Sequence, residues 1–407
     1  MAEDTAVTPE NEGDRARSTT RAFDVVIIGA GSIGAPAALA LAEAGARVLV
    51  LDATKSVGQG SNKAAIGGVR ATHSDPSKIR LCRRSLEIFS TWREARGDDI
   101  EWSTGGYVFP AYRPEDEAAL RGLLSVQRAQ GLAIDWLDAP ALLEVVPDLR
   151  RDGLRGGTFS PQDGHCSPLL ALHAIFEHAV RAGAQFRFEE PATAVEVDAG
   201  RVVAVHTARG RLPTRFVVNA AGAWSSAIAT PSGAPLGRPL PVKPDAHEAG
   251  ITEPVAPFLA PLVVDMRPGP GSANCYFFQH RSGQVIFCLT PSPLVWGDDT
   301  RDTSDFLPMV ARRLLDVMPR LAALRVRRTW RGLYPMTPDG LPLLGFTGGI
   351  EGYFVASGMC GQGFMLGPAI GELIARAVLG TPTEGDAAVL AALSPDRVFG
   401  AAAERLR

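Results

Sequence analysis

The stretch that most constrains the fold of this chain is "DVVIIGAGSIGAPAALALAEAGARVLVLDA", residues 24–53. Val25–Ile28 form an apolar, β-branched run that is typical of a buried parallel strand, and Gly29, Gly31 and Gly34 follow it in the G-x-G-x-x-G spacing. The first glycine permits a tight turn, the second lets the backbone approach a pyrophosphate, and the third lets the helix pack closely on the strand. The pattern predicts a Rossmann-like strand-turn-helix-strand unit that binds a dinucleotide.

Two further features of this stretch support dinucleotide binding. The helix that follows the glycines presents unpaired N–H groups and partial positive charge to phosphates. Asp52 ends the second strand, where a carboxylate can accept hydrogen bonds from an adenosine ribose. A tight turn without a ligand is the alternative, and the motif alone does not separate FAD from NAD. No second strand-GxGxxG-helix occurs, because "RPGPGSAN" (residues 267–274) lacks a preceding apolar strand, so we expect one dinucleotide.

Composition and charge narrow the classes of partner. The chain has 407 residues, 46% of them hydrophobic and 21% charged, with a formal net charge of -3. Basic residues are scattered without a basic block, which argues against nucleic acid and anionic membrane as partners. The apolar runs are shorter than the ~20 residues that a membrane span needs, so we expect no membrane span and a cytoplasmic location. Residues 1–21 are polar and lack an apolar signal core, and we expect a disordered tail there.

The five cysteines predict neither a disulfide framework nor a metal site. They form no C-x-x-C pair and no ligand spacing with the seven histidines. We expect buried, inert thiols and no metal. These cysteines are Cys82, Cys166, Cys275, Cys288 and Cys360.

Four separated motifs together resemble one family. After the glycine loop come "VVNAAGAWSS" (217–226), "RTWRGLYPMTPDGLPLLG" (328–345) before the strand "GYFVASG", and "SGMCGQGFMLGPAIGELIA" (357–375). In this order they resemble the D-amino acid oxidase-like superfamily of FAD enzymes, which includes sarcosine oxidases, glycine oxidase and dye-linked L-proline dehydrogenases. The segments at 58–89 and 245–255 are most similar to the β subunits of dye-linked L-proline dehydrogenase and heteromeric sarcosine oxidase.

The resemblance implies an α/β fold, α+β overall, in two discontinuous domains. A Rossmann-like FAD-binding domain of the glutathione-reductase type takes residues 22–100, 150–225 and 328–385. An antiparallel-sheet substrate domain takes residues 101–149 and 226–327. Residues 386–407 are expected to form a C-terminal helix and tail on the surface.

The second glycine-rich segment has a chemical reason to lie beside the flavin ring. When a flavin accepts a hydride at N5, negative charge develops around N1 and O2. Backbone N–H groups of residues 361–365 and the positive end of a helix that starts near Gly367 can stabilise that charge. A plain strand-to-helix connection is the alternative.

The motifs and the resemblance assign a set of residues to FAD. In the family, the position of Val195 makes a backbone contact with adenine. The cofactor-binding residues are Gly29, Gly31, Ser32, Ile33, Gly34, Asp52, Ala53, Ser61, Asn62, Lys63, Gly67, Gly68, Val195, Ala220, Ala221, Gly222, Trp224, Gly332, Tyr334, Asp339, Gly358, Gly361, Gln362, Gly363 and Phe364.

The substrate-site residues also follow from the resemblance. Arg70 in "GGVRATH" takes the place of the substrate-binding arginine of sarcosine oxidases, and a guanidinium suits a carboxylate. Met365 replaces a second carboxylate-binding lysine, and Arg331 or Tyr276 could compensate for that loss. His247 and Glu248 are expected on a strand surface, because a lone histidine is usually structural.

Two departures from sarcosine oxidases predict the chemistry more finely. Gly332 stands where the monomeric enzyme attaches FAD through a cysteine, so we expect non-covalent FAD. The chain has no lysine beyond Lys243 to promote oxygen reduction, which favours a dehydrogenase that passes electrons to a partner subunit or another acceptor.

The sequence therefore predicts FAD-dependent oxidation of a small secondary or N-substituted amino acid, similar to proline, sarcosine or glycine. Hydride would pass from the amine carbon to flavin N5 and leave an imine. The alternatives are a flavin monooxygenase and a non-catalytic FAD-binding subunit of an oxidoreductase complex.

Overall fold

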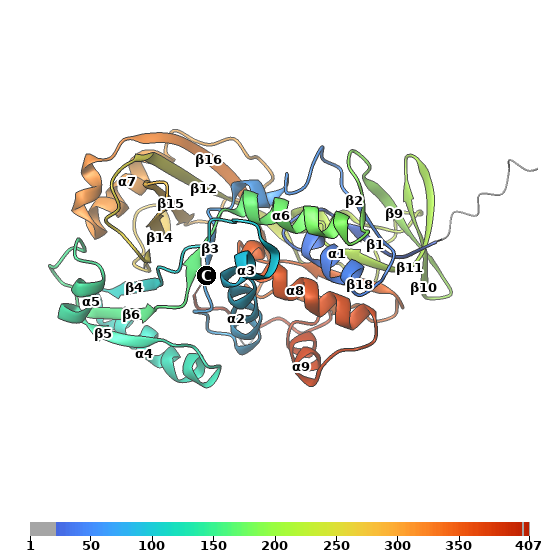
Figure 1. The fold of residues 1–407 in the computed structure, drawn as a ribbon, viewed down its shortest axis with the longest axis horizontal. Coiled ribbons are helices and arrows are strands. Elements are labelled where there is room, and N and C mark those ends of the chain that lie inside the picture. The colour runs from blue at the N-terminus through green and yellow to red at the C-terminus, as the bar shows by residue number, and fades with distance from the viewer. Residues whose placement is uncertain (1–21, 401–402, 407) are drawn as a thin grey trace, which may run out of the picture.

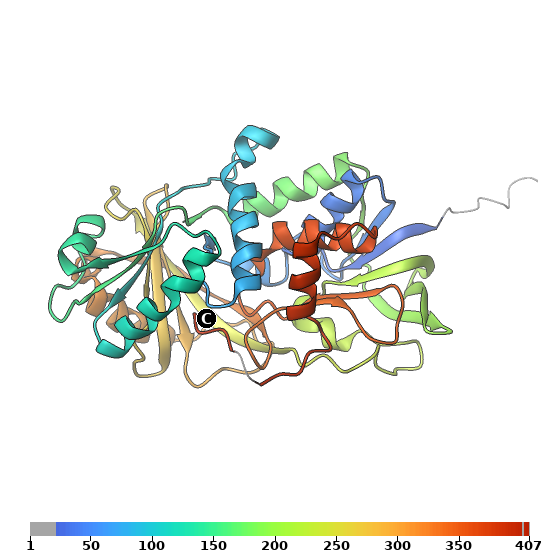
Figure 2. The same ribbon diagram turned by 90° about the horizontal axis from the view of Figure 1, so that it is seen from below.

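The protein is built on two large sheets that lie end to end (Figure 1). The computed structural model describes residues 22–400 and 403–406. The expected tail at residues 1–21 lies outside the described residues. Between the two sheets stands helix α2 (Pro76–Ser90), and the end of the described chain lies beside it (Figure 2).

The first sheet is mainly parallel and contains the expected dinucleotide unit. Its strand order is β17-β18-β11-β1-β2-β8, with β17 antiparallel to β18 and the remaining pairs parallel. A β9-β10 hairpin pairs with the first half of β11. The strands are β1 (Phe23–Ile28), β2 (Val48–Leu51), β8 (Gln185–Arg187), β9 (Ala192–Asp198), β10 (Arg201–Thr207), β11 (Gly210–Asn219), β17 (Leu343–Phe346) and β18 (Tyr353–Ser357).

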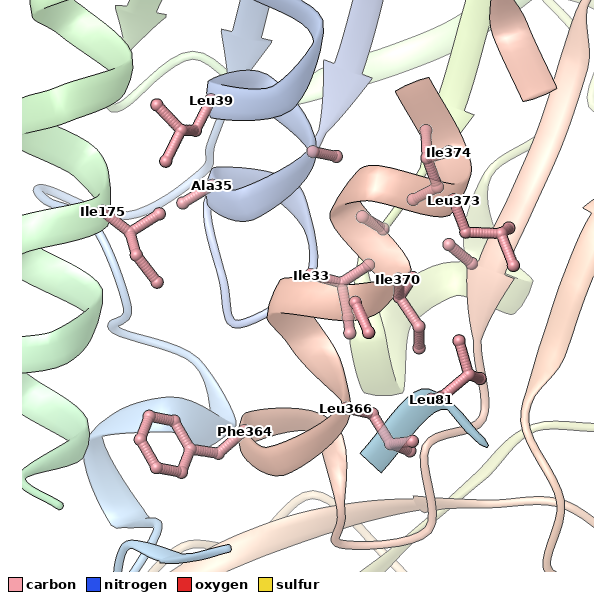
Figure 3. Packing of buried hydrophobic residues seen from close by; sticks show 14 of the residues in the cluster. Ile33, Ala35, Leu39, Leu81, Ile175, Phe364, Leu366, Ile370, Leu373 and Ile374 are labelled. Atoms are coloured by element: carbon pink, nitrogen blue, oxygen red, sulfur yellow. The ribbon is translucent and has the colours of Figure 1, made fainter. Parts of the chain in front are cut away.

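Three helices cover one face of this sheet, namely α1 (Gly34–Glu43), α6 (Pro168–Arg181) and α8 (Gly363–Val378). Figure 3 shows apolar side chains of α1, α6 and α8 meeting between the helices. The α1–α8 crossing is close: a Cβ on Gly367 would lie 2.0 Å from the carbonyl oxygen of Ser32. Small residues thus bring the start of α8 against the first glycine loop, so the two loops that are far apart in sequence become neighbours.

The second sheet is antiparallel except where β13 pairs with β4. Its order is β16-β12-β15-β14-β13-β4-β6-β5. Helices α5 (Ala139–Val145) and α7 (Phe306–Val317) pack on one face, and α4 (Pro114–Ala129) contributes to the cluster on the other. The strands are β4 (Tyr107–Ala111), β5 (Asp135–Asp138), β6 (Gly156–Ser160), β12 (Lys243–Pro254), β13 (Leu262–Asp265), β14 (Ser272–Gln279), β15 (Gln284–Pro291) and β16 (Val326–Met336).

The remaining elements join these layers. They are α3 (Trp92–Arg96), α4 (Pro114–Ala129), α5 (Ala139–Val145), α7 (Phe306–Val317), α9 (Glu384–Ala392), the short strands β3 (Gly68–Val69) and β7 (Gly164–His165), and the 3-10 helices η2 (Ser61–Ala64), η3 (Gly222–Ala227) and η4 (Pro319–Ala323). Strands β14 and β15 form an antiparallel hairpin, and helix α7 follows it in the chain.

Two strands lie on the other side of the expected domain division. Strands β6 and β16 pair within the second sheet, whereas the sequence boundaries place residues 150–225 and most of β16 in the cofactor domain. β16 pairs with β12 over almost its whole length, which fixes it there. The segment after α9 also differs from a surface tail, because Glu404 and Leu406 are 3% and 4% exposed.

Candidate active site

One cavity of about 560 Å³ connects the two sheets. It begins at the carboxyl ends of β1 and β2, passes the starts of α1 and α8, and ends among β12, β14 and β15 of the second sheet. The carboxyl ends of parallel strands are where open α/β sheets bind their ligands. The cavity is therefore long and has a nucleotide-binding end and a second, chemically different end.

The three glycines of the first loop differ in what surrounds them. A Cβ on Gly29, whose φ is +107°, would lie 2.5 Å from the carbonyl oxygen of Ala220, and one on Gly34 would lie 1.8 Å from that of Gly29. A Cβ on Gly31 would meet nothing within 4 Å, and Gly31 lines the cavity. Two glycines thus serve packing, and the third leaves open space beside the backbone, as a pyrophosphate requires.

Asp52 lies beside this loop at the end of β2 and lines the cavity. Its Oδ2 accepts a hydrogen bond from the backbone N–H of Ala30 at 2.6 Å. Its Oδ1 accepts from the backbone N–H and the hydroxyl of Thr54, at 2.8 and 2.6 Å. The carboxylate therefore orders the loop around the nucleotide end and keeps part of its acceptor capacity, which suits the expected contact with a ribose.

The second glycine loop forms the opposite wall. Gly361 has φ +81°, and a Cβ there would lie 2.1 Å from the ring of Tyr334. Gln362 is the N-cap of α8 and gives it no side-chain cap, while its own buried Oε1 has no hydrogen-bond partner and the residue lines the cavity. An orphaned buried amide oxygen beside uncapped helix N–H groups fits a polar ligand such as the pyrimidine end of a flavin.

The start of α8 corrects one expectation. The helix begins at Gly363, not near Gly367, and Pro368 lies inside it. Proline favours a first helical turn, which explains the error. The earlier start places the N-terminal N–H groups of α8, rather than a loop, against the cavity.

Arg70 brings a cation to the cavity. It is 6% exposed, lines the cavity, and holds its guanidinium 5.6 Å from the centroid of the Phe109 ring. Its Nη1 donates to the carbonyl of Thr72, and its Nη2 donates to the carbonyl of Leu406 at 2.6 Å. A guanidinium has five N–H groups, so the remaining donors are available to an anion in the cavity.

Aromatic and imidazole groups from the second sheet line the same region. The hydroxyl groups of Tyr276 and Tyr334 lie 2.7 Å apart, and the ring of His247 stacks on Tyr334 with centroids 3.7 Å apart. His247 Nε2 lies 2.8 Å from Asp245 Oδ2, and its Nδ1 has no partner. Burial lowers the pKa of His247, so the imidazole is neutral near pH 7.

This placement shows that the expected strand-surface position of His247 is wrong, since the residue is 5% exposed and lines the cavity. β12 lies between β15 and β16, so both its edges are paired, and the face that carries His247 lines the cavity, where the ring stacks on Tyr334. Asp245 and His247 are two residues apart and share one face of the strand, which is the sequence signal that could have revealed the pair.

Most of the residues predicted from the sequence line this cavity. They are Gly29, Gly31, Ser32, Ile33, Asp52, Ala53, Ser61, Asn62, Gly67, Gly68, Arg70, Ala220, Ala221, Gly222, Trp224, Tyr276, Gly332, Tyr334, Gly361, Gln362, Gly363, Phe364 and Met365. Six predicted residues are not among its lining, namely Gly34, Lys63, Val195, Arg331, Asp339 and Gly358.

Arg331 and Lys63 point elsewhere. Arg331 neighbours Gly332, which faces the cavity, but its own guanidinium donates to the carbonyl of Arg301 at 3.2 Å and lies 4.0 Å from Glu248. Successive side chains of a strand point to opposite faces, which explains this orientation. Lys63 is exposed on η2.

Val195, Asp339 and Gly358 contact other parts of the protein instead of the cavity. The backbone N–H of Val195 donates to the carbonyl of Ala229 at 2.9 Å. Asp339 forms a bidentate pair with Arg397, with both distances 2.9 Å. A Cβ on Gly358 would lie 2.4 Å from the Thr337 side chain, so this glycine serves a close turn.

Several lining residues were not predicted from the sequence. Those with polar or reactive groups are Thr54, Tyr107, His247, Cys288, Thr290 and Cys360. They come from strands and turns whose partners are distant in sequence. Burial raises the pKa of Cys288 to about 12, so its thiol is protonated and unreactive, as expected of these cysteines.

The described residues support neither a metal site nor a membrane-spanning helix. Within residues 22–400 and 403–406, no group of three or more His, Cys, Asp or Glu side chains could hold a metal ion. Among the helices of that same part of the chain, none combines the length and apolarity needed to span a membrane.

Comparison with known proteins decides the family. The profile of the DAO family, described as FAD dependent oxidoreductase, matches residues 24–377. The chain belongs to the DAO family of FAD-dependent oxidoreductases. The match contains both glycine loops, and FAD is the cofactor of this family. The open space at Gly31 and the orphaned Gln362 Oε1 fit that group.

Individual relatives agree with this assignment. The chain is 28% identical over 367 residues to glycine oxidase of Geobacillus kaustophilus (strain HTA426), covering 88% of this chain and 93% of that protein. The L-proline dehydrogenase structure from P. horikoshii superposes with a TM-score of 0.84 at 27% identity, covering 92% of this chain and 97% of that one. Glycine oxidase of G. kaustophilus superposes with a TM-score of 0.82, covering 93% and 99%. At the level of this DAO family, the comparisons support FAD-dependent oxidation of an amino acid or amine.

Proposed function

We propose that this DAO-family protein oxidises a small secondary or N-substituted amino acid, similar to proline, sarcosine or glycine, to an imine. One observation carries the proposal: a single cavity joins the nucleotide end of the first sheet to a buried arginine and a neutral histidine at the second sheet. Bound FAD supplies the hydride acceptor, N5 of its ring, for the hydrogen on the amine carbon. The chain supplies binding, orientation and the proton acceptor.

Arg70 binds the carboxylate of the substrate in this proposal. Its guanidinium is buried at the cavity and is already fixed by the carbonyls of Thr72 and Leu406. A fixed guanidinium that binds a carboxylate with two parallel N–H groups orients the substrate as well as holding it. Tyr276 and Met365 line the rest of the substrate end and restrict the space there.

His247 accepts the proton of the substrate amine in this proposal. Because hydride leaves readily only from a carbon next to a neutral amine, the ammonium form must lose a proton first. The Nε2–H of His247 donates to Asp245, so the lone pair stays on Nδ1, which has no partner. Asp245 is itself fixed by the backbone N–H of Val295 at 2.7 Å, and its carboxylate stabilises the imidazolium that forms.

The lysines favour a dehydrogenase over an oxidase. The sequence has four lysines, and none of them lines the cavity. Lys55, Lys63 and Lys243 are exposed, and the ammonium of Lys78 pairs with Glu404 at 3.1 Å. Because no lysine ammonium lines the cavity and Arg70 is assigned to the substrate carboxylate, no further cation is left there to stabilise reduced oxygen, and we infer that electrons pass to a partner subunit or another acceptor.

The surroundings of Gly332 support non-covalent FAD. A Cβ at this position would lie 2.5 Å from the Cβ of Ala64, so β16 passes too close to η2 for the side chain of a cysteine. The two cysteines in the cavity lining are Cys288, whose thiol is protonated, and Cys360, whose Sγ lies 3.3 Å from the Thr337 hydroxyl.

The test of the proposed function is anaerobic titration of the FAD-loaded protein with a panel of amines, recorded through the flavin absorption band. The panel contains L-proline, D-proline, sarcosine, glycine and N-substituted amino acids. We expect one class to bleach the band, and slow reoxidation when air is admitted. Rapid release of hydrogen peroxide would contradict the dehydrogenase assignment, and no bleaching by any member would contradict the function.

A matched pair of arginine variants tests the substrate site. Arg70→Gln removes the cavity guanidinium, whereas Arg331→Gln removes one that points away from the cavity. We expect KM to rise at least 100-fold for Arg70→Gln, because a bidentate pair between charged groups contributes about 3 kcal/mol. KM should stay within threefold for Arg331→Gln, and the reverse order would exclude Arg70 as the carboxylate site.

A further inference from the structure

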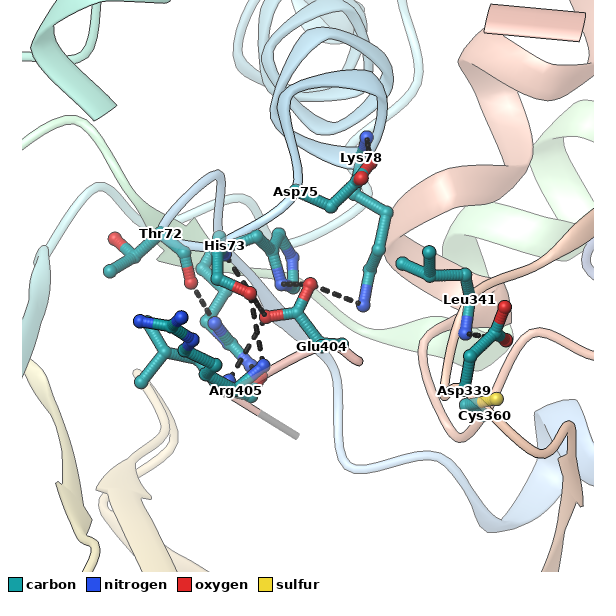
Figure 4. Close-up of polar contacts among 12 residues, drawn as sticks. Thr72, His73, Asp75, Lys78, Asp339, Leu341, Cys360, Glu404 and Arg405 are labelled. Carbon is teal, nitrogen blue, oxygen red and sulfur yellow. Dashed lines mark hydrogen bonds and ion pairs between the residues drawn. The ribbon is translucent and has the colours of Figure 1, made fainter. Parts of the chain in front are cut away.

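The segment Glu404–Leu406 passes beside the substrate end of the cavity with its first and last side chains buried. Glu404 and Leu406 are 3% and 4% exposed. This segment lies against residues 72–74, which come just after Arg70 in the sequence. The backbone N–H of Arg405 donates to the hydroxyl of Ser74 at 2.9 Å (Figure 4). Residues more than 300 positions apart in the sequence are thus joined directly behind the cavity arginine.

Glu404 fastens this segment. Its Oε2 lies 3.1 Å from Lys78 Nζ, and both side chains are at most 1% exposed. Its Oε1 accepts from the backbone N–H and the hydroxyl of Ser74, at 3.0 and 2.8 Å. Figure 4 shows the Glu404 carboxylate between the ammonium of Lys78 and the side chain of His73. Removal of one partner of a buried ion pair leaves the other charge uncompensated, so the segment is strongly held in place.

Leu406 connects the fixed segment to the cavity arginine. Its carbonyl accepts the Arg70 Nη2–H at 2.6 Å, and its side chain packs in the apolar cluster that contains Phe109 and Leu262. Leu262 also lines the cavity. The guanidinium plane is rigid, so fixing two of its N–H groups on the carbonyls of Thr72 and Leu406 sets the direction of the others.

The other side of the Arg70 loop is also fixed. Buried Asp163 accepts from the backbone N–H of Ala71 at 2.9 Å and from the Thr72 hydroxyl at 2.7 Å. The backbone N–H of Glu404 donates to the carbonyl of Asp339 at 3.0 Å. Asp339 lies in the loop between β16 and β17. The segment therefore links the arginine loop to the turn beside the second glycine loop.

A buried ion pair is an inefficient way to stabilise a fold, since apolar groups of similar volume often do as well. A buried ion pair does, however, fix one position of the segments that it joins. We propose that Glu404 is a positioning residue for the substrate carboxylate: paired with Lys78, it holds the Leu406 carbonyl on Arg70 and so aims the remaining guanidinium N–H groups into the cavity. This inference rests on the proposed function, in which Arg70 binds the substrate.

The test compares Glu404→Ala with two companions in the FAD-loaded protein. The double variant Lys78→Met with Glu404→Leu replaces the ion pair by an apolar pair and keeps the segment packed. Arg405→Gln changes an exposed side chain in the same segment and is the control. Hydrogen exchange of residues 403–406 reports whether the segment is docked, independently of activity.

Two further measurements report how well Arg70 binds a carboxylate. One is the Kd of acetate, a carboxylate that cannot be oxidised, followed through the flavin absorption band. The other is the KM and limiting rate of anaerobic flavin reduction. For Glu404→Ala we expect fast exchange of the segment and at least a tenfold rise in both Kd and KM, with the limiting rate within threefold. The double variant and Arg405→Gln should stay within threefold of the unmodified chain.

The outcomes separate this inference from the proposed function. Unchanged acetate affinity in a variant whose segment exchanges fast would overturn the positioning role and leave the function intact. If Glu404→Ala fails to fold, the double variant decides: a docked segment with restored affinity supports the proposal, and a docked segment with weakened affinity contradicts it. An unmodified chain that binds no acetate and is reduced by no amine would refute the proposed function itself, and this inference with it.

Discussion

Gly31 and Gly34 allow a sharp test of the nucleotide site, because the two positions differ in what an added methyl group meets. In Gly31→Ala the new Cβ has no neighbour within 4 Å, and the backbone lies outside the left-handed region. Such a substitution stabilises a protein by about 0.4–1 kcal/mol through the unfolded chain. In Gly34→Ala the Cβ would lie 1.8 Å from the carbonyl oxygen of Gly29, and overpacking of this kind costs about 1–3 kcal/mol.

The two variants should therefore separate folding from FAD binding. We expect Gly31→Ala to unfold at the same temperature as the unmodified apoprotein or slightly higher, and to bind FAD at least tenfold more weakly, about 1.4 kcal/mol. Gly34→Ala should lower the unfolding temperature of the apoprotein itself. Thermal unfolding of both apoproteins and titration with FAD measure these effects. Unchanged FAD affinity in Gly31→Ala would refute the assignment of this open space to the pyrophosphate.

Three further predictions follow from the site and the core. Gly361→Ala should lower the free energy of unfolding, measured by urea denaturation, by at least about 2 kcal/mol, because its Cβ would lie 2.1 Å from the Tyr334 ring and the residue has φ +81°. An unchanged urea midpoint would argue against the close packing of Gly361 on Tyr334. Acid precipitation should leave FAD in the supernatant, and a yellow pellet would show covalent attachment. Burial lowers the pKa of His165 to about 3, whereas an unfolded histidine titrates near 6.5. The contribution of His165 to the free energy of unfolding is therefore present above pH 6.5 and is lost as the pH falls toward 3. The loss between pH 6.5 and 4 is roughly 3 kcal/mol. His165→Phe should remove this loss, the exposed His173→Phe should keep it, and equal pH profiles for both would contradict the prediction.

The sequence predicts the fold best where a local pattern has one physical solution. The first glycine loop is such a case, because its strand, turn and helix are contiguous and each glycine has a separate steric reason. The second glycine loop was assigned to the same site from chemistry, and it does line the cavity. Its helix start was misplaced because Pro368, a residue that favours first turns, lies inside α8.

Sequence reasoning fails where a residue's environment comes from distant strands. Arg331 was a candidate for the substrate, but strand alternation turns it away from the cavity while its neighbour Gly332 lines it. His247 has a signal in its spacing to Asp245, yet its burial depends on the ring of Tyr334, which stacks on it from β16. Glu404 carries no local motif at all, and its contact with Lys78 is visible only in the folded chain.

The measurement that tests the central claim most directly is anaerobic reduction of the bound flavin by a matched pair of compounds, an amino acid and the same amine without its carboxylate. L-proline with pyrrolidine, and sarcosine with dimethylamine, are suitable pairs, and NADPH is tested beside them. The account predicts that an amino acid bleaches the flavin band, that its decarboxylated partner does so far more weakly, and that NADPH has no effect. Reduction by NADPH, or equal reduction by both members of a pair, would contradict a site built around Arg70 for a carboxylated amine.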